Sequence, residues 1–202
     1  VQAEEVKSAG RKVASLEEFL HIAKEDFHEA YRIFTERHFS LILSDQSEKI
    51  RSLYAGMSQQ PVTYQHLEEF LIAAGAKEKV TLSLNREEAG FYDVSESVQE
   101  SLYIHRSGWG HLRADIEVNG DFLEAGKHVV TEEDFIGSTC EINYVIRQEK
   151  LGKGNQYGEI IVKTPYQKLV YHVLASRGTE SAVNLDLLEK QYRISLMKEY
   201  LG

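Results

Sequence analysis

The hydrophobic period of the sequence changes near Lys79, and this change constrains the fold more than any other feature. Before Lys79, apolar residues recur at helical spacing, whereas after it they alternate with polar residues in short runs. A helix buries one stripe of side chains and a strand buries every second one. The chain is therefore predicted to be α+β, with a helical domain over residues 1–77 and a strand-rich domain over residues 78–177.

Capping signals divide the first part into four helices. Ser15 and Asp26 each precede an apolar helical stripe and have a glutamate three residues later, which is the spacing of a helix N-cap. A third helix is predicted from Gln46 to Ala55, with Gly56 as its stop, and a fourth from Pro61 to Gly75. We expect these helices to pack as a small bundle.

The second part contains seven or eight short strand signals. Leu112–Asn119 and Cys140–Arg147 alternate most clearly, and Glu159–Thr164 and Lys168–Ala175 close the series. Val80, Leu82 and Leu84 alternate at the start of this part, and weaker runs lie near Phe91, Leu102 and Val129. No helical pattern interrupts them, and this number of strands is typical of a two-sheet sandwich.

The helical period returns in residues 178–202, which are predicted to begin a following helical region. A C-terminal helix from Asn184 to Leu201 would carry two apolar stripes, of which one is enough to cover this chain. Leu187, Ile194 and Leu201 form the second stripe, for which the sequence offers no partner. We expect these three residues to dock on following helices of a longer protein or, in the isolated chain, to mediate self-association.

Several motifs of the strand-rich part resemble bacterial immunoglobulin-like domains. They are Asp134–Gly137, the alternating run to Ile146, Leu151–Gly154, Gly158–Thr164 and the run from Leu169 to Val173. In such domains a leucine, two glycines, a strand and a threonine form the last hairpins. The resemblance implies an immunoglobulin-like antiparallel β-sandwich.

With its flanking helices, the chain is similar to an internal part of a bacterial family classed as a domain of unknown function. The family consists of long proteins in which immunoglobulin-like and helical segments precede a helical-repeat array. The resemblance implies neighbouring domains as partners and brings no catalytic residue with it. Because the first residue is Val1, we expect the chain to be cut from a longer protein, and its cellular location stays open.

The charge balance argues against two classes of partner. The sequence has 23 Lys and Arg against 32 Asp and Glu, a net charge of −9 at pH 7. Such a chain is not attracted to phosphate backbones or anionic lipid. No run of about 18 apolar residues occurs either. We expect neither nucleic-acid binding nor membrane insertion.

The histidines and the single cysteine do not form a recognisable catalytic or metal site. His21 with Glu25 and His28 with Arg32 are helical neighbours without a third ligand, and His105 and His111 are only two ligands beside the acidic Asp115 and Glu117. Gly152–Gly158 resembles a phosphate-binding loop, but it opens a strand and is predicted to be a hairpin turn. Cys140 is predicted to be buried and inert. We expect no enzyme activity, no cofactor and no metal.

Five aromatic residues near strand ends are the remaining candidates for ligand binding: Tyr92, Tyr103, Trp109, Tyr157 and Tyr166. On one exposed surface, such rings stack on a sugar or peptide. Tyrosine and tryptophan also fill sandwich cores, and Trp109, between two glycines, is expected in the sandwich core or its rim.

The leading hypothesis is a non-catalytic structural or protein-interaction module of a larger multidomain bacterial protein. The alternative is a carbohydrate- or peptide-binding module that uses the aromatic residues at the sandwich rim.

Overall fold

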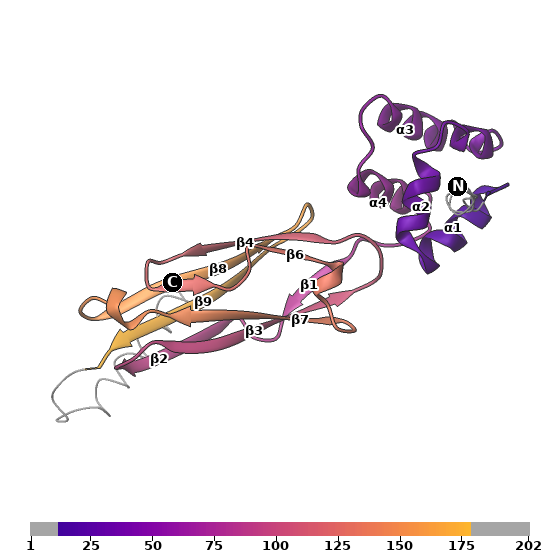
Figure 1. Cartoon of the computed structure of the whole chain (residues 1–202). Coiled ribbons are helices and arrows are strands. Elements are labelled where there is room, and N and C mark those ends of the chain that lie inside the picture. Colours follow the sequence, from indigo (N-terminus) through magenta and orange to yellow (C-terminus); the bar gives the residue numbers. More distant parts are fainter. Residues whose placement is uncertain (1–11, 179–202) are drawn as a thin grey trace, which may run out of the picture. The chain divides into compact units, whose positions relative to one another are not determined.

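Helices make up the first part of the computed structural model, which describes residues 12–178 (Figure 1). They are α1 (Leu16–Glu25), α2 (Phe27–Phe34), the 3-10 helix η2 (Phe39–Leu43), α3 (Glu48–Ser58) and α4 (Tyr64–Ala73). The predicted N-caps of α1 and α2 are confirmed, because the Ser15 and Asp26 side chains accept the backbone N–H groups of Glu18 and Glu29 at 3.2 and 3.1 Å.

The third helix does not stop at Gly56, so that prediction is wrong. Gly56 lies inside α3, which continues to Ser58. One glycine inside a helix costs only about 0.5–1 kcal/mol relative to alanine, which is too little to end it. Pro61 supplies the stronger signal, because the residue before a proline is biased away from helical geometry.

Aromatic side chains fill the core of the helical bundle. Phe19, Phe34, Phe39 and Phe70 are at most 3% exposed. Phe39 lies edge-on to Phe19 and Phe34, with ring centroids 4.7 and 5.1 Å apart. These residues come from α1, α2, η2 and α4, so one aromatic cluster holds four elements together.

Within residues 12–178, nine strands form two sheets, which Figure 1 shows as two layers. In sheet order, the first sheet contains β1 (Thr81–Leu84), β3 (Val98–Ser107), β7 (Thr139–Ile146) and β5 (Leu123–Ala125). The second contains β2 (Glu88–Val94), β9 (Lys168–Arg177), β8 (Asn155–Lys163), β4 (Arg113–Asn119) and β6 (Val129–Thr131). Two facing sheets of mostly antiparallel strands, the second with the β8–β9 hairpin in its interior, form a β-sandwich of the immunoglobulin-like kind. The predicted sandwich is confirmed.

One pairing departs from a simple antiparallel sandwich, because β2 pairs in parallel with β9. The sequence pattern missed β5, a strand of three residues that pairs antiparallel with β7. Gly158 lies inside β8 rather than in a turn. A Cβ there would come within 2.9 Å of Phe122, so a glycine is required by close packing.

A tyrosine pair joins the two sheets in the core. Tyr144 on β7 and Tyr171 on β9 are fully buried, and their hydroxyl oxygens are 2.8 Å apart. Burial raises the pKa of Tyr144 far above its ordinary value, and the hydrogen bond to Tyr171 adds to this shift. Each hydroxyl is therefore satisfied by the other in an otherwise apolar interior.

The open edge of β1 is covered by a side chain. The Gln167 amide accepts a hydrogen bond from the Leu82 backbone N–H at 2.7 Å and donates one to the Leu82 carbonyl at 3.1 Å. These are the bonds that a neighbouring strand would make. Gln167 lies in the turn between β8 and β9, so it also ties the second sheet to the first.

The described chain forms two compact units that are not contiguous in sequence. The helical unit contains residues 12–80 together with Gly108–His111, and the sandwich unit contains Thr81–Ser107 and residues 112–178. The predicted change of period at Lys79 lies beside the first crossing between units. The domain ranges 1–77, 78–177 and 178–202 stay predictions. The predicted C-terminal helix, with Leu187, Ile194 and Leu201, lies outside the described residues.

Candidate binding site in the helical unit

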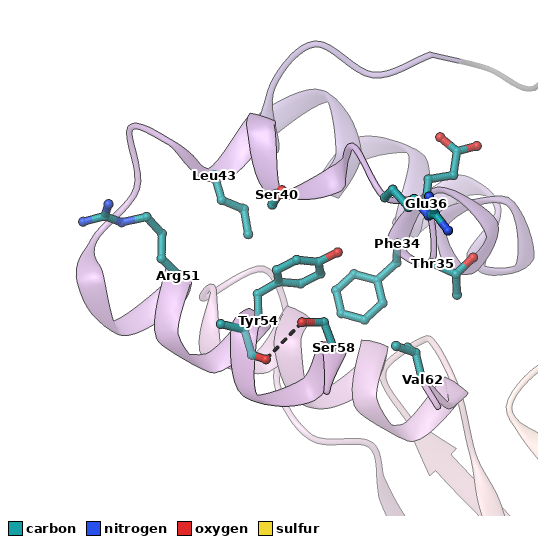
Figure 2. Close-up of a pocket in the computed structure, with 11 residues that line it drawn as sticks. Phe34, Thr35, Glu36, Ser40, Leu43, Arg51, Tyr54, Ser58 and Val62 are labelled. Carbon is teal, nitrogen blue, oxygen red and sulfur yellow. Dashed lines mark hydrogen bonds between the residues drawn. The ribbon is translucent and has the colours of Figure 1, made fainter. Parts of the chain in front are cut away.

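A cavity of about 460 Å³ opens between α2, η2 and α3 (Figure 2). Its walls are formed by Phe34, Thr35, Glu36, Arg37, Ser40, Leu43, Arg51, Tyr54, Ala55, Ser58 and Val62. The segment that links α2 to α3 supplies one side, and the exposed face of α3 supplies the other. A volume of this size is within the range of about 300–1,000 Å³ that is usual for binding pockets.

Two aromatic rings form the apolar part of the cavity. Figure 2 shows the Tyr54 ring in the middle of the labelled residues, beside Phe34 and facing Leu43. The Tyr54 and Phe34 rings meet nearly edge-on, with centroids 5.4 Å apart. Phe34 and Leu43 also belong to the buried core, so the floor of the cavity is fixed by the packing beneath it.

Several polar groups of the cavity are already engaged. The Thr35 hydroxyl donates to the Arg32 carbonyl at 2.8 Å, and the Ser58 hydroxyl donates to the Ala55 carbonyl at 3.0 Å, as Figure 2 shows for Ser58. The Glu36 carboxylate is held by the Arg32 guanidinium. These groups are turned toward their own helix or a neighbour and offer little to a ligand.

The remaining polar groups have no bond to another described residue. They are the Arg37 and Arg51 guanidiniums and the Ser40 and Tyr54 hydroxyls. Both arginines are exposed, and Figure 2 shows Arg51 extending outward from α3 at one end of the cavity. Burial raises the pKa of Tyr54, so its hydroxyl stays protonated and able to donate at neutral pH.

A buried ion pair lies elsewhere in the same unit. The side chains of Glu68 on α4 and Lys77 are 1% exposed and bonded to each other. Lys77 also donates to the Trp109 carbonyl and lies 4.9 Å from the centroid of its ring, and Glu68 accepts the His111 backbone N–H at 3.2 Å. The pair thus holds Gly108–His111 in the helical unit.

This arrangement corrects the prediction for Trp109. Its side chain packs against the helical core, not the sandwich core. The two flanking glycines adopt positive φ, 81° at Gly108 and 102° at Gly110, which lets the chain bend on both sides of Trp109. The partners of this segment could not be recognised from local sequence, because the buried charges of Glu68 and Lys77 lie in a different part of the chain.

The other four predicted stacking residues lie on the sandwich unit. Tyr103 is exposed on the outer face of the first sheet, where β3 alternates. Tyr157 pairs with Leu174 across β8 and β9, and the Tyr92 hydroxyl lies against Gly90, which pairs with Leu174 from the other side. Tyr92 and Tyr157 therefore share the outer face of the second sheet. Tyr166 lies in the β8–β9 turn.

The histidine candidates are dispersed in the structure. His21 contacts Glu25 at 3.2 Å on α1, and His28 bonds to the Tyr64 hydroxyl at 3.1 Å. His105 lies on β3, whereas His111 stacks on Tyr64 in the helical unit, with centroids 5.7 Å apart. Within residues 12–178, no three His, Cys, Asp or Glu side chains are grouped so that they could hold a metal ion.

Cys140 is buried on β7, as expected, and burial raises the pKa of its thiol. None of the helices that the structure describes has the length and hydropathy needed to cross a membrane.

The only sequence signal that relates to the cavity is the apolar stripe of each helix. Phe34 on α2 and Tyr54 on α3 belong to such stripes, and both pack in or against the core. Arg37, Ser40 and Arg51 were not singled out, because each is an ordinary polar residue in its local sequence. Only the path of residues 35–47 brings them to one opening.

A family model described as "Family of unknown function (DUF5717) N-terminal" matches residues 1–202. No curated protein matches the sequence. Among solved structures, PapD-like domain 7 of human CEP192 is similar over 49% of this chain and 87% of its own, with 10% identity and a TM-score of 0.37. The MSP family member WR4 from C. elegans is similar over 48% of this chain and 97% of its own, with 4% identity and a TM-score of 0.34. The FixG-related protein from Vibrio parahaemolyticus is similar over 51% and 100%, with 10% identity and a TM-score of 0.35. With such low scores, the assignment of the sandwich rests on its own strand order.

Proposed function

We propose that this chain, which belongs to the DUF5717 N-terminal family of unknown function, is a non-catalytic protein-interaction module of a larger bacterial protein. The observation that carries the proposal is the cavity of the helical unit. It combines an apolar floor fixed by the core with polar groups that no described residue engages. Such a mixture of shape and unused hydrogen-bonding capacity is typical of recognition sites.

The sandwich supplies a framework in this proposal. Its two sheets are joined in the core by Tyr144 and Tyr171, and its β1 edge is covered by Gln167. A covered edge resists unplanned strand pairing with other chains. The sandwich would therefore act as a spacer, while the helical unit carries the contact with a partner.

The carbohydrate- or peptide-binding alternative at the sandwich rim stays a prediction. It needs several aromatic rings on one surface, yet Trp109 lies in the helical unit and Tyr103 lies on the opposite sheet from Tyr92 and Tyr157. Two tyrosines on one face are a smaller stacking surface than the five predicted residues together would make.

Site-directed photocrosslinking in the full-length protein tests the interaction role. A benzophenone amino acid at position 55, on the cavity wall, should crosslink to one protein partner in cells. The same probe at position 49, also on α3 but away from the cavity, should not. The partner is then purified, and binding is measured with the cavity-filling variant Ala55→Trp and the control Lys49→Trp.

Loss of binding in Ala55→Trp alone supports the proposal. Equal crosslinking at both positions, no crosslinking at position 55, or unchanged binding of Ala55→Trp would contradict it.

A further inference from the structure

We infer that the cavity of the helical unit binds an acidic peptide segment, in which a carboxylate lies next to an apolar side chain. This inference rests on the proposed interaction role and specifies the chemistry of the partner. It follows from three properties of the cavity: the kind of polar group that is unengaged, the charge around the opening, and the apolar floor.

The unengaged polar groups are donors. The Arg37 and Arg51 guanidiniums can only donate hydrogen bonds, and the protonated Tyr54 hydroxyl and the Ser40 hydroxyl can each donate one. The one carboxylate on the wall, Glu36, is occupied by Arg32. A ligand that enters this cavity therefore meets an excess of donors, which an acceptor-rich anionic group satisfies best.

The charge around the opening is unusual for this protein. The chain as a whole has a net charge of −9, which disfavours acidic partners in general. Arg32, one turn before the cavity, is saturated by Glu29 and Glu36, with one nitrogen–oxygen distance to Glu29 of 2.6 Å. Arg37 and Arg51 have no such carboxylate among the described residues. Because no residue in the described part of the chain holds the Arg51 guanidinium, it can turn over the opening when an anion arrives.

The floor selects what carries the carboxylate. An apolar surface lies between the donors and is formed by Phe34, Leu43 and the Tyr54 ring. An anion without an apolar group would leave this surface exposed to water. A glutamate or aspartate beside a phenylalanine or leucine covers the floor and reaches the rim together. Arginine pairs carboxylates in a planar, two-point geometry, which gives this contact direction as well as charge.

The test uses the whole 202-residue chain and three probes of defined chemistry. They are the blocked peptide acetyl-Gly-Glu-Phe-Gly-amide, the same peptide with Gln in place of Glu, and free 3-phenylpropionate. Binding is followed by the shifts of backbone amide signals in two-dimensional NMR, which detects weak affinities and reports the site. The variants are Arg37→Gln with Arg51→Gln, Tyr54→Phe, and the control Lys49→Gln, which removes one positive charge away from the cavity.

We expect the Glu peptide to shift the signals of cavity residues and to bind about five- to tenfold more tightly than the Gln peptide, as charge-assisted contacts at a partly exposed site allow. The double arginine variant should lose this preference, Tyr54→Phe should weaken it, and Lys49→Gln should keep it. Thermal melting of the double arginine variant and of Lys49→Gln should be unchanged, because all three side chains are exposed.

Equal binding of the two peptides, an unchanged preference in the double arginine variant, or no shifts at cavity residues would overturn the acidic-peptide inference. Binding of 3-phenylpropionate as tight as the Glu peptide would also overturn it, in favour of a small-molecule ligand. None of these results touches the crosslinking outcome at position 55, so failure of the ligand class is separable from failure of the interaction role.

Discussion

Replacing Lys77 with methionine should destabilise the helical unit strongly. Methionine has a similar length and no charge, so the change leaves Glu68 buried without its cationic partner. It also removes the donor to the Trp109 carbonyl. Breaking a buried ion pair from one side costs about 3–5 kcal/mol. Small domains have a total unfolding free energy of about 5–15 kcal/mol, so the change removes at least about a fifth of the stability.

Urea denaturation followed by helical circular dichroism and tryptophan fluorescence measures this effect. With a loss of about 4 kcal/mol and a denaturant slope of about 2 kcal/mol per molar, the midpoint of the helical transition should fall by roughly 2 M. Trp109 is the only tryptophan, and its ring lies 4.9 Å from the Lys77 ammonium. Its emission therefore reports the same event locally. Lys49→Met, an exposed change on α3, is the control and should leave the midpoint unchanged.

The double variant Glu68→Leu with Lys77→Met separates charge burial from packing. With both charges removed, the cost should be smaller than the sum of the single costs. The double variant should still be about 1–3 kcal/mol less stable than the unchanged protein, because the His111 backbone N–H loses its acceptor. A cost below about 1 kcal/mol for Lys77→Met, or strict additivity in the double variant, would refute the argument that a buried charge pair holds Gly108–His111 in place.

Three further variants test other parts of the structure. Tyr144→Phe should destabilise the sandwich by about 1–3 kcal/mol in urea titrations, because the buried hydroxyl of Tyr171 loses its partner. Adding Tyr171→Phe should restore part of the loss, because no buried hydroxyl is then left without a partner. Gly110→Ala should be more destabilising than Gly154→Ala, since both have positive φ but only the first places a Cβ against the buried ion pair; equal melting temperatures would contradict this. The pKa of Asp134 is lowered by its hydrogen-bonded lysine, so stability from this group is present above the ordinary aspartate pKa near 4 and is lost as the pH falls below it. Asp134→Asn should flatten the acid limb of a pH–stability curve.

Local signals in the sequence predicted most of the elements. A helix cap involves residues three apart, so Ser15 and Asp26 identified their helices without tertiary information. Alternation over eight residues identified β7 equally well. Leu123–Ala125 was missed because three residues are too few to show a period, and Gly56 misled because one glycine is a weak breaker.

The candidate site was not predictable from the same signals. A cavity is the space that neighbouring side chains fail to fill, and that depends on the path of the chain between α2 and α3 as much as on their stripes. Trp109 shows the same limit. Its glycine neighbours indicate a bend in the chain but not which of the two cores its ring packs against. That depends on Glu68 and Lys77, two charged residues that would ordinarily be assigned to the surface.

The inclusion of Gly108–His111 in the helical unit has a consequence during synthesis. A chain that has only reached Val80 lacks a segment to which the Glu68–Lys77 pair is bonded. The helical unit can be completed only after about 30 more residues have been synthesised. At a synthesis rate of about 5–20 residues per second, this is a delay of a few seconds. During this interval the first strands have already emerged. The order of events on the ribosome therefore favours an incomplete bundle that is finished by the β3–β4 connection, rather than two domains that fold one after the other.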